Sequence, residues 1–348
     1  MKYYFSVLIS LFTMLAVTST TFSMGPNPEP PKPYCETQYP VILVPGVTGF
    51  DTILGFVDYW YGIPDDLEQN GAVVFPVSLS GWQSTEERGD QLLRFIDTLM
   101  ELYPEYEKFN IIAHSHGATT SRYAMHHRPE VFASLTTIAG PHQGTPAADY
   151  LINDIPDMLQ PVAFGGIELL TGDLVALLSG HSELIGTQDA EACAKHFSIE
   201  GIQAFNNDYP CVGVPKECSQ GLYGEDCTTQ SGSFYGNGRG EQLTPSDPGA
   251  IRFYSWTGNV GTGSITTTDL LDSLMVVING MVRANGYEGD ADGFVPVTSS
   301  HFGEVLSDSY YWNHFDEINQ ALGFISPFAA NPKSVFRQHL NRLQTEGY

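Results

Sequence analysis

The sequence predicts an α/β fold, in which a mostly parallel sheet is covered by helices on both faces. Short apolar runs that end at glycine, proline or a polar residue alternate along the chain with segments whose apolar residues recur at helical spacing. The apolar runs are continuous, as expected for strands that are buried on both faces. With 348 residues, of which 42% are hydrophobic, the chain is long enough to form a sizeable packed core.

The elements are expected in the following order. Strands are expected over the apolar runs 39–45, 72–77, 109–113 and 135–139, and regular structure is expected to return over 251–256. Helices are expected over 65–70, 118–127 and 332–343. A further helix should begin after Ser84, because Ser84 and Glu87 form a capping box ahead of an amphipathic pattern. The glycine- and proline-rich stretch 211–249 is predicted to be a long excursion from the domain.

The first residues have the layout of a secretory signal peptide. Lys2 precedes an apolar run over 5–17, and small polar residues follow to Ser23. The apolar run is shorter than the ~20 residues that span a bilayer, although a short membrane anchor is the alternative reading. We expect a signal peptide over 1–23, a proline-rich leader over 24–34 and a single domain over 35–348, in a protein that is secreted.

Charge and cysteine content narrow the class of protein further. The net charge of −25 argues against nucleic acid and anionic membrane surfaces as main partners, because both repel a polyanion. No C-x-x-C motif occurs, so after export one or two disulfides are expected rather than a metal site. The pairing stays open among five residues: Cys35, Cys193, Cys211, Cys218 and Cys227.

Ser115 is a candidate nucleophile. It lies between an expected strand and an expected helix, with Ala113 two residues before it and Gly117 two residues after it. A nucleophile elbow needs small residues at both places, because larger side chains would collide with the neighbouring strand and helix. The usual motif has glycine where Ala113 stands. An ordinary turn with an incidental serine is the alternative, which the strand–turn–helix context makes the weaker one.

A nucleophilic serine needs a histidine as base and a carboxylate that orients the histidine. In folds with such an elbow the acid and then the histidine follow the serine in sequence. The base should therefore lie toward the C-terminus, where three histidines qualify: His301, His314 and His339. His314 is favoured, because its segment 310–317 is rich in polar and aromatic residues and suits a loop above the sheet. Asp290 and Asp292 share one turn and are both candidates for the acid.

The oxyanion of such a reaction needs two backbone N–H donors. One is expected from His116, which follows the nucleophile. The other is expected from the loop 45–49 after the first strand, where Val47 has an N–H group and Pro45 has none.

At this point the chain resembles a known family, the secreted bacterial triacylglycerol lipases of the Pseudomonas/Burkholderia type. The matching strings are residues 39–51, 57–64, 88–93, 113–117, 140–144, 253–256, 292–293, 299–303, 313–320 and 339–343. The resemblance implies an α/β-hydrolase fold with a helical lid, and hydrolysis of long-chain acylglycerols at a lipid–water interface. It implies Ser115 as nucleophile, Asp292 as acid and His314 as base, with Val47 and His116 as oxyanion donors.

The resemblance also implies a structural calcium ion. Its ligands would be Asp316, Gln320, the carbonyl of Phe324 and an aspartate about twenty residues before the acid, a place that Asp269 fits better than Asp272. Oxygen ligands of this kind suit calcium rather than zinc. Relatives often need a membrane-tethered foldase in the periplasm, through which they reach the medium.

Besides Ala113 in the elbow and an excursion over 211–249 that is longer than usual, two departures from the family are visible. Pro45-Gly46 stands where the family often has His-Gly, and Thr298 stands where the family has a disulfide cysteine, so that bridge cannot form.

The lid is expected over about 157–180, in an apolar stretch for which a core helix is the alternative. Its helical apolar face would consist of Ile167, Leu170, Leu174, Leu177 and Leu178. Two rival functions remain: a secreted esterase or polyester depolymerase with the same triad, and a binding protein that has kept the fold and lost catalysis.

Overall fold

The structure is a computed structural model. It describes residues 33–49, 52–53, 57–173, 176, 180–215, 222–224, 232–262, 270–320, 322–325 and 329–348. The expected signal peptide and nearly all of the expected leader lie outside these residues. Within the described part of the chain, no helix is long and apolar enough to cross a membrane.

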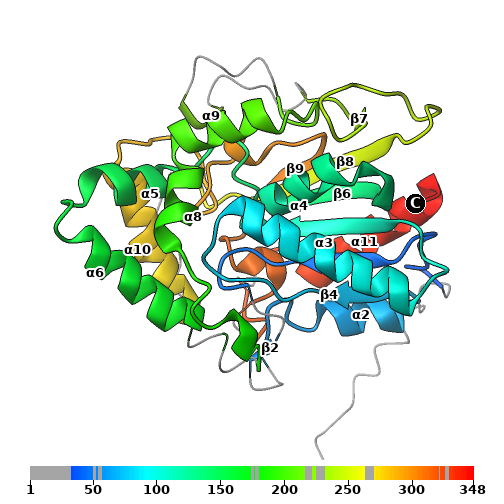
Figure 1. Cartoon of the computed structure of the whole chain (residues 1–348), viewed down its shortest axis with the longest axis horizontal. Helices are drawn as coiled ribbons and strands as arrows, with labels where there is room; N and C mark the ends of the chain where they lie inside the picture. Colours follow the sequence, from blue (N-terminus) through cyan, green and yellow to red (C-terminus); the bar gives the residue numbers. More distant parts are fainter. Residues whose placement is uncertain are drawn as a thin grey trace, which may run out of the picture.

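A seven-stranded, mostly parallel sheet forms the centre of the molecule (Figure 1). Its order is β4 (Val74–Pro76), β1 (Val41–Val44), β5 (Phe109–His114), β6 (Phe132–Ile138), β8 (Ile251–Gly258) and β7 (Tyr235–Gly236), with β9 (Glu304–Tyr310) also paired to β8. β7 runs antiparallel to the first residues of β8, and β9 runs parallel to its later residues. A separate hairpin joins β2 (Thr52–Ile53) to β3 (Val57–Asp58).

Helices cover both faces of the sheet, as the alternating pattern predicted. α3 (Thr85–Leu102) and α4 (His116–His127) pack on one face, and α2 (Ile63–Gln69) and α11 (Pro332–Glu346) pack on the other. Successive residues of β1 point to opposite faces, so Ile42 belongs to the first hydrophobic cluster and Leu43 to the second. Ser84 caps α3 by accepting a hydrogen bond from the Glu87 backbone N–H at 3.2 Å.

A second group of helices lies beyond one end of the sheet (Figure 1). It consists of α5 (Pro146–Asp149), the π-helix η2 (Tyr150–Asp154), α6 (Gln160–Ile167), the π-helix η3 (Glu168–Asp173), α8 (Ala190–Phe197) and α10 (Leu270–Ala284), with α9 (Ile199–Asp208) beside them. Single 3₁₀ turns complete the described elements: η1 (Pro129–Val131), η4 (Ser182–Leu184), η5 (Leu222–Gly224), η6 (Thr298–Ser300) and η7 (Asp316–Ile318). The sequence patterns had not predicted α8, α9, α10 or β9.

The described residues of the stretch 211–249, which was predicted to be an excursion, include some that pack against the central sheet. Of these, Cys211, Val212 and Val214 belong to the same hydrophobic cluster as Ile251 and Phe253. They pack there because β7 pairs with the first residues of β8 and holds the segment against the sheet.

The cysteines require a correction. Cys35, Cys193 and Cys211 are free and buried, so an expectation of two disulfides is wrong. Cys218 and Cys227 lie outside the described residues.

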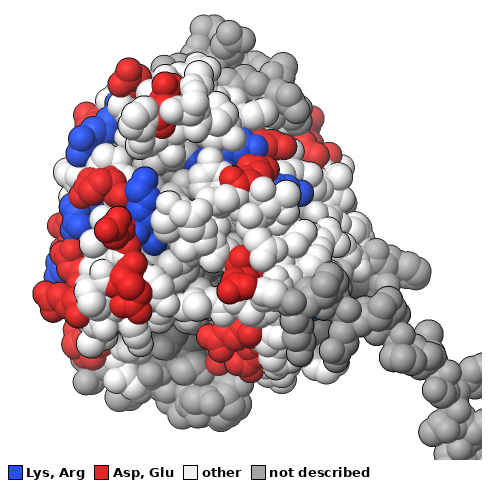
Figure 2. Space-filling view, turned by 90° about the vertical axis from the view of Figure 1, so that its right-hand side faces the viewer, with Lys and Arg blue, Asp and Glu red and all other residues white. Residues whose placement is uncertain are grey.

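Acidic side chains dominate the charge of the surface. Figure 2 shows carboxylates spread over one face, with basic groups lying beside them. Several arginines form ion pairs: half-buried Arg128 pairs with Asp97 and Glu130, and buried Arg252 pairs with Glu304 and Glu346.

Candidate active site

Ser115 occupies a strained turn between β5 and α4. Its φ of 54° and ψ of −126° lie in a region that residues other than glycine rarely adopt. Its backbone N–H donates to the Ile138 carbonyl of the neighbouring strand at 2.8 Å. A Cβ at Gly117 would lie 2.5 Å from the Val44 carbonyl oxygen, which explains why this position is glycine. The predicted nucleophile elbow is therefore present.

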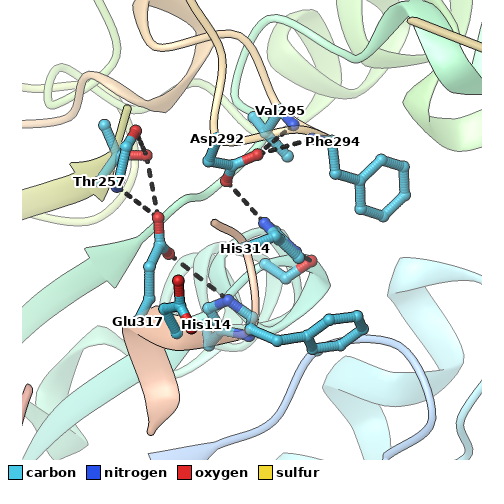
Figure 3. Close-up of polar contacts among 12 residues, drawn as sticks. His114, Thr257, Asp292, Phe294, Val295, His314 and Glu317 are labelled. Atoms are coloured by element: carbon cyan, nitrogen blue, oxygen red, sulfur yellow. Dashed lines mark hydrogen bonds and ion pairs between the residues drawn. The ribbon is translucent and has the colours of Figure 1, made fainter. Parts of the chain in front are cut away.

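His314 and Asp292 complete a hydrogen-bonded triad with Ser115, and Figure 3 shows the contact between Asp292 and His314. His314 Nε2 lies 2.9 Å from Ser115 Oγ, and His314 Nδ1 lies 2.7 Å from Asp292 Oδ2. Ser115, Asp292 and His314 are only 3%, 0% and 1% exposed. With the proton assigned to Nδ1, the imidazole donates to the carboxylate and Nε2 is free to accept the serine proton.

The loops that carry the acid and the base are fixed to each other. The His314 backbone N–H donates to the Asp292 carbonyl at 3.0 Å. The other carboxylate oxygen of Asp292 accepts from the N–H groups of Phe294 and Val295 at 2.8 and 2.7 Å (Figure 3). The carboxylate is thus held from both sides, and only Oδ2 faces the imidazole.

The other candidates lie elsewhere. Asp290 is exposed and accepts a hydrogen bond from Asn259. His301 contacts Asp308, and His339 is buried against Thr136 under α11. The choice of Asp292 and His314 from the sequence agrees with this geometry, in which neither rival histidine bonds to Ser115.

Arg88 holds the loop that carries the other expected oxyanion donor. This fully buried guanidinium donates to the carbonyls of Pro45 and Gly46 at 2.6 and 3.0 Å, and to those of Ser80 and Gly81. In a trans peptide the carbonyl and the following N–H point in opposite directions. Since the Gly46 carbonyl points to Arg88, the N–H of Val47 points away from it. Residues 88–93 form one of the strings that resemble the lipase family, but no role was predicted for Arg88 from the sequence.

The side chain of His116 is part of the support for the elbow. Its Nε2 lies 3.0 Å from Thr85 Oγ1, and its Nδ1 lies 3.6 Å from Cys193 Sγ. Burial lowers the pKa of His116 well below its usual value, so the ring is neutral. The predicted contribution of this residue is its backbone N–H, while the ring locks the first turn of α4 in place.

The expected calcium ligands are partly described. Asp316 and Gln320 are buried, whereas the side chain of Phe324 is 63% exposed. Asp269 lies outside the described residues. Among the described residues, Asn313 links buried Asp272 to Asp316, because its Nδ2 donates to Asp272 at 2.6 Å and its backbone N–H donates to Asp316 at 3.0 Å.

This donor set fits a hard cation. The buried carboxylates of Asp272 and Asp316 both accept hydrogen bonds from Asn313. The amide nitrogen of Gln320 donates to the backbone carbonyls of Asp58 and Tyr59. The ligands on offer are therefore oxygens, which are what calcium prefers.

Comparison with known proteins places the fold and the family. A family model described as the alpha/beta hydrolase fold matches residues 39–186. The chain is 33% identical over 350 residues to a triacylglycerol lipase of Burkholderia plantarii, with 97% of this chain and 95% of that protein covered. It is 36% identical over 319 residues to a triacylglycerol lipase of Vibrio cholerae, with 90% of each covered.

Solved structures of lower identity share the fold. The crystal structure of Staphylococcus hyicus lipase matches with a TM-score of 0.56 at 18% identity, covering 88% of this chain and 96% of that one. A mature Bacillus licheniformis lipase matches with a TM-score of 0.53 at 15% identity, covering 92% and 95%. With the triad geometry and relatives of this identity over nearly its whole length, the chain belongs to the triacylglycerol lipases of the α/β-hydrolase fold and is a carboxylic ester hydrolase.

Proposed function

We propose that the protein is a secreted lipase that hydrolyses long-chain acylglycerols through an acyl-enzyme on Ser115. His314 takes the serine proton as Oγ attacks the ester carbonyl, and Asp292 stabilises the imidazolium that forms. The N–H groups of Val47 and His116 stabilise the tetrahedral oxyanion. His314 then gives its proton to the leaving alcohol. Water, activated by the same imidazole, releases the fatty acid.

The observation that carries this proposal is the unbroken hydrogen-bond sequence from Asp292 through His314 to Ser115, with heavy-atom distances of 2.7 and 2.9 Å. Both distances lie in the range that a general base needs for proton transfer. They argue against the rival in which the fold binds a ligand without catalysis.

The helices beyond the sheet favour a large, apolar substrate. Ser115 is 3% exposed, so a covering segment has to move before a large ester can enter. The segment around α6 carries exposed apolar side chains: Met158 (82%), Leu159 (51%), Val162 (73%) and Leu169 (62%). Such a surface favours contact with lipid. Of the apolar face expected from the sequence, Ile167 packs against the cluster around Phe164, and Leu174, Leu177 and Leu178 lie outside the described residues.

The two ends of this segment are anchored, as a lid requires. Before α5, Thr145 Oγ1 donates to the Phe294 carbonyl at 2.6 Å, next to the loop of the acid. After η4, the Asp189 N–H donates to the Trp82 carbonyl at 2.6 Å, and Gln188 Oε1 accepts from the Trp82 N–H at 2.8 Å. We propose that the chain between these two anchors is the lid.

We further propose that a structural calcium ion is held by Asp316, Gln320, the Phe324 carbonyl and one of Asp269 and Asp272. Asp272 is supported by its shared contact with Asn313. The ion would supply positive charge between two buried carboxylates and tie the His314 loop to α10. It would take no part in the proton transfers.

Export through the periplasm with the help of a foldase is the remaining part of the proposal. It rests on the sequence layout of residues 1–23 and on the resemblance to secreted lipases. Pairings such as β6 with β8 join strands more than a hundred residues apart, and such topologies fold slowly. Poor recovery of activity on unassisted refolding is expected, and full recovery would remove the case for a foldase.

The experiment combines an active-site label with a substrate series. A fluorophosphonate should label the wild-type protein and leave Ser115→Ala unlabelled, with turnover of the variant lower by several orders of magnitude. Emulsified triolein should be hydrolysed faster than soluble p-nitrophenyl butyrate. A preference for the short soluble ester would indicate an esterase, and an unlabelled wild-type protein would overturn the serine mechanism.

A further inference from the structure

A second acid–histidine–hydroxyl array lies beside the catalytic triad. Glu317, His114 and Tyr59 follow one another as Asp292, His314 and Ser115 do (Figure 3 shows the two acids and the two histidines). The rings of His114 and His314 are 4.5 Å apart between centroids. Glu317 and His114 are completely buried, and Tyr59 is 2% exposed. The mechanism described above uses none of these three side chains.

Donors and acceptors can be assigned consistently along the hydrogen bonds of the array. The Gly46 N–H donates to Tyr59 Oη at 2.8 Å, and Tyr59 Oη lies 2.7 Å from His114 Nδ1. Because Oη already accepts from Gly46, its own proton is assigned to His114 Nδ1. The remaining N–H of the imidazole, on Nε2, then faces Glu317 Oε2 at 3.6 Å.

Glu317 anchors the array to the sheet. Its Oε1 accepts from the Gly258 N–H at the end of β8 and from Thr257 Oγ1 at 3.4 Å. Its Oε2 and His114 Nε2 have no hydrogen-bond partner among the described residues other than this mutual approach. The array therefore runs from the end of β8 to the backbone of the oxyanion loop.

The hydroxyl end of the array meets the oxyanion loop opposite Arg88. The Pro45 carbonyl accepts from Arg88, while the Gly46 N–H of the same peptide group donates to Tyr59. These groups lie in one peptide plane and point to its opposite edges, so Arg88 and Tyr59 together fix its rotation. The plane immediately precedes the one that carries the Val47 N–H.

Space in this region is tight enough for that fixation to matter. A Cβ on Gly46 would lie 2.6 Å from Ser115 Cβ and 2.8 Å from Tyr59 Oη. A rotation of the peptide would thus displace the oxyanion donor relative to the nucleophile.

We propose that Tyr59, supported by His114 and Glu317, is a positioning residue that holds the Val47 N–H in the orientation required by the oxyanion. This inference rests on the proposed serine mechanism and adds a specific role for three residues to it. Loss of one oxyanion donor costs about 10²–10³ in turnover in serine hydrolases, and a donor that is only misaligned should cost less.

The test is Tyr59→Phe, which removes the hydroxyl and keeps the ring. With p-nitrophenyl butyrate, kcat should fall by about tenfold or more while KM changes little. The inhibition constant of butylboronic acid, whose adduct on Ser115 places an oxygen in the oxyanion hole, should rise by a similar factor. The matched control is Tyr254→Phe, which deletes another buried hydroxyl, bonded to Glu346 under α11. The control should keep wild-type kcat and inhibition constant.

Glu317→Gln gives a second, independent measurement. If Glu317 acts on the loop only through His114 and Tyr59, this change should lower kcat less than Tyr59→Phe does and should add nothing to it in the double variant. Wild-type kcat and boronate inhibition in Tyr59→Phe would overturn the inference, and so would additive losses in the double variant. Fluorophosphonate labelling of the wild-type protein keeps the two proposals apart, because its absence would refute the serine mechanism itself.

Discussion

The carboxyl end of the sheet and the helices beyond it differ in burial and in the polarity of what they expose. At the sheet, Ser115, Asp292 and His314 are at most 3% exposed, and each is held by at least one backbone hydrogen bond. Around α6, Met158 and Val162 are more than 70% exposed, and the helix continues into a π-helix. The triad is thus buried and held by backbone hydrogen bonds, whereas the segment around α6, which we propose as the lid, exposes apolar side chains. Variants should therefore separate turnover from interfacial action.

The largest effect should come from the acid. Asp292→Asn should lower kcat by about 10⁴-fold on soluble and emulsified esters alike, because an amide cannot hold the imidazole in the required tautomer. Asp290→Asn is the control, because this exposed residue shares the turn and not the triad. The reverse ranking in a parallel assay would show that the acid is wrongly assigned.

Removal of the proposed calcium ion should lower the thermal stability of the protein. Exhaustive chelation should lower the melting temperature by roughly 5–10 °C and reduce activity, and added calcium should restore both. Asp272→Asn should reproduce the effect of chelation if Asp272 is the ligand, and Asp269→Asn should reproduce it if the choice from the sequence is right. A melting temperature indifferent to chelation, with metal analysis finding no bound calcium in either sample, would refute the site.

A smaller effect is expected at the lid, and on one class of substrate only. The double variant Met158→Ser, Val162→Ser should lose about tenfold in activity on emulsified triolein, since it removes apolar surface that would contact lipid. Its rate on p-nitrophenyl butyrate should be unchanged. Leu102→Ser, at the far end of α3 and 67% exposed in the wild type, should behave like the wild type on both substrates. Equal losses on both substrates would assign this segment to the core.

The smallest effect is expected from thiol reagents. Burial raises the pKa of the Cys193 thiol to about 12, so at pH 8 this group is a neutral thiol that is shielded from solvent. Iodoacetamide should leave activity intact at that pH and should alkylate Cys193 only after denaturation. Mass spectrometry of the native protein would detect the opposite outcome. Rapid modification of Cys193 with loss of activity would mean that the wall behind His116 opens in solution.

The sequence was most informative where local rules suffice. Continuous apolar runs predicted β1, β5 and β6, regular structure was predicted where β8 lies, and the capping box predicted the start of α3. The spacing around Ser115 predicted the elbow, because its steric demands act over a few residues. β9 was missed because its apolar residues Val305 and Leu306 are adjacent rather than alternating, and polar residues follow them, so neither strand pattern applies. Arg88 and Tyr59 were missed because their roles depend on partners tens of residues away.

The order of the elements along the chain has a consequence for synthesis of the protein. One edge of β8 pairs with β7, which precedes it in the sequence, and with β9, which follows it. Ser115 belongs to the part of the chain that is made early, whereas His314 is made 199 residues later. A nascent chain can therefore form its elbow without a base. A product truncated before His314 would carry Ser115 without the base that the proposed mechanism requires.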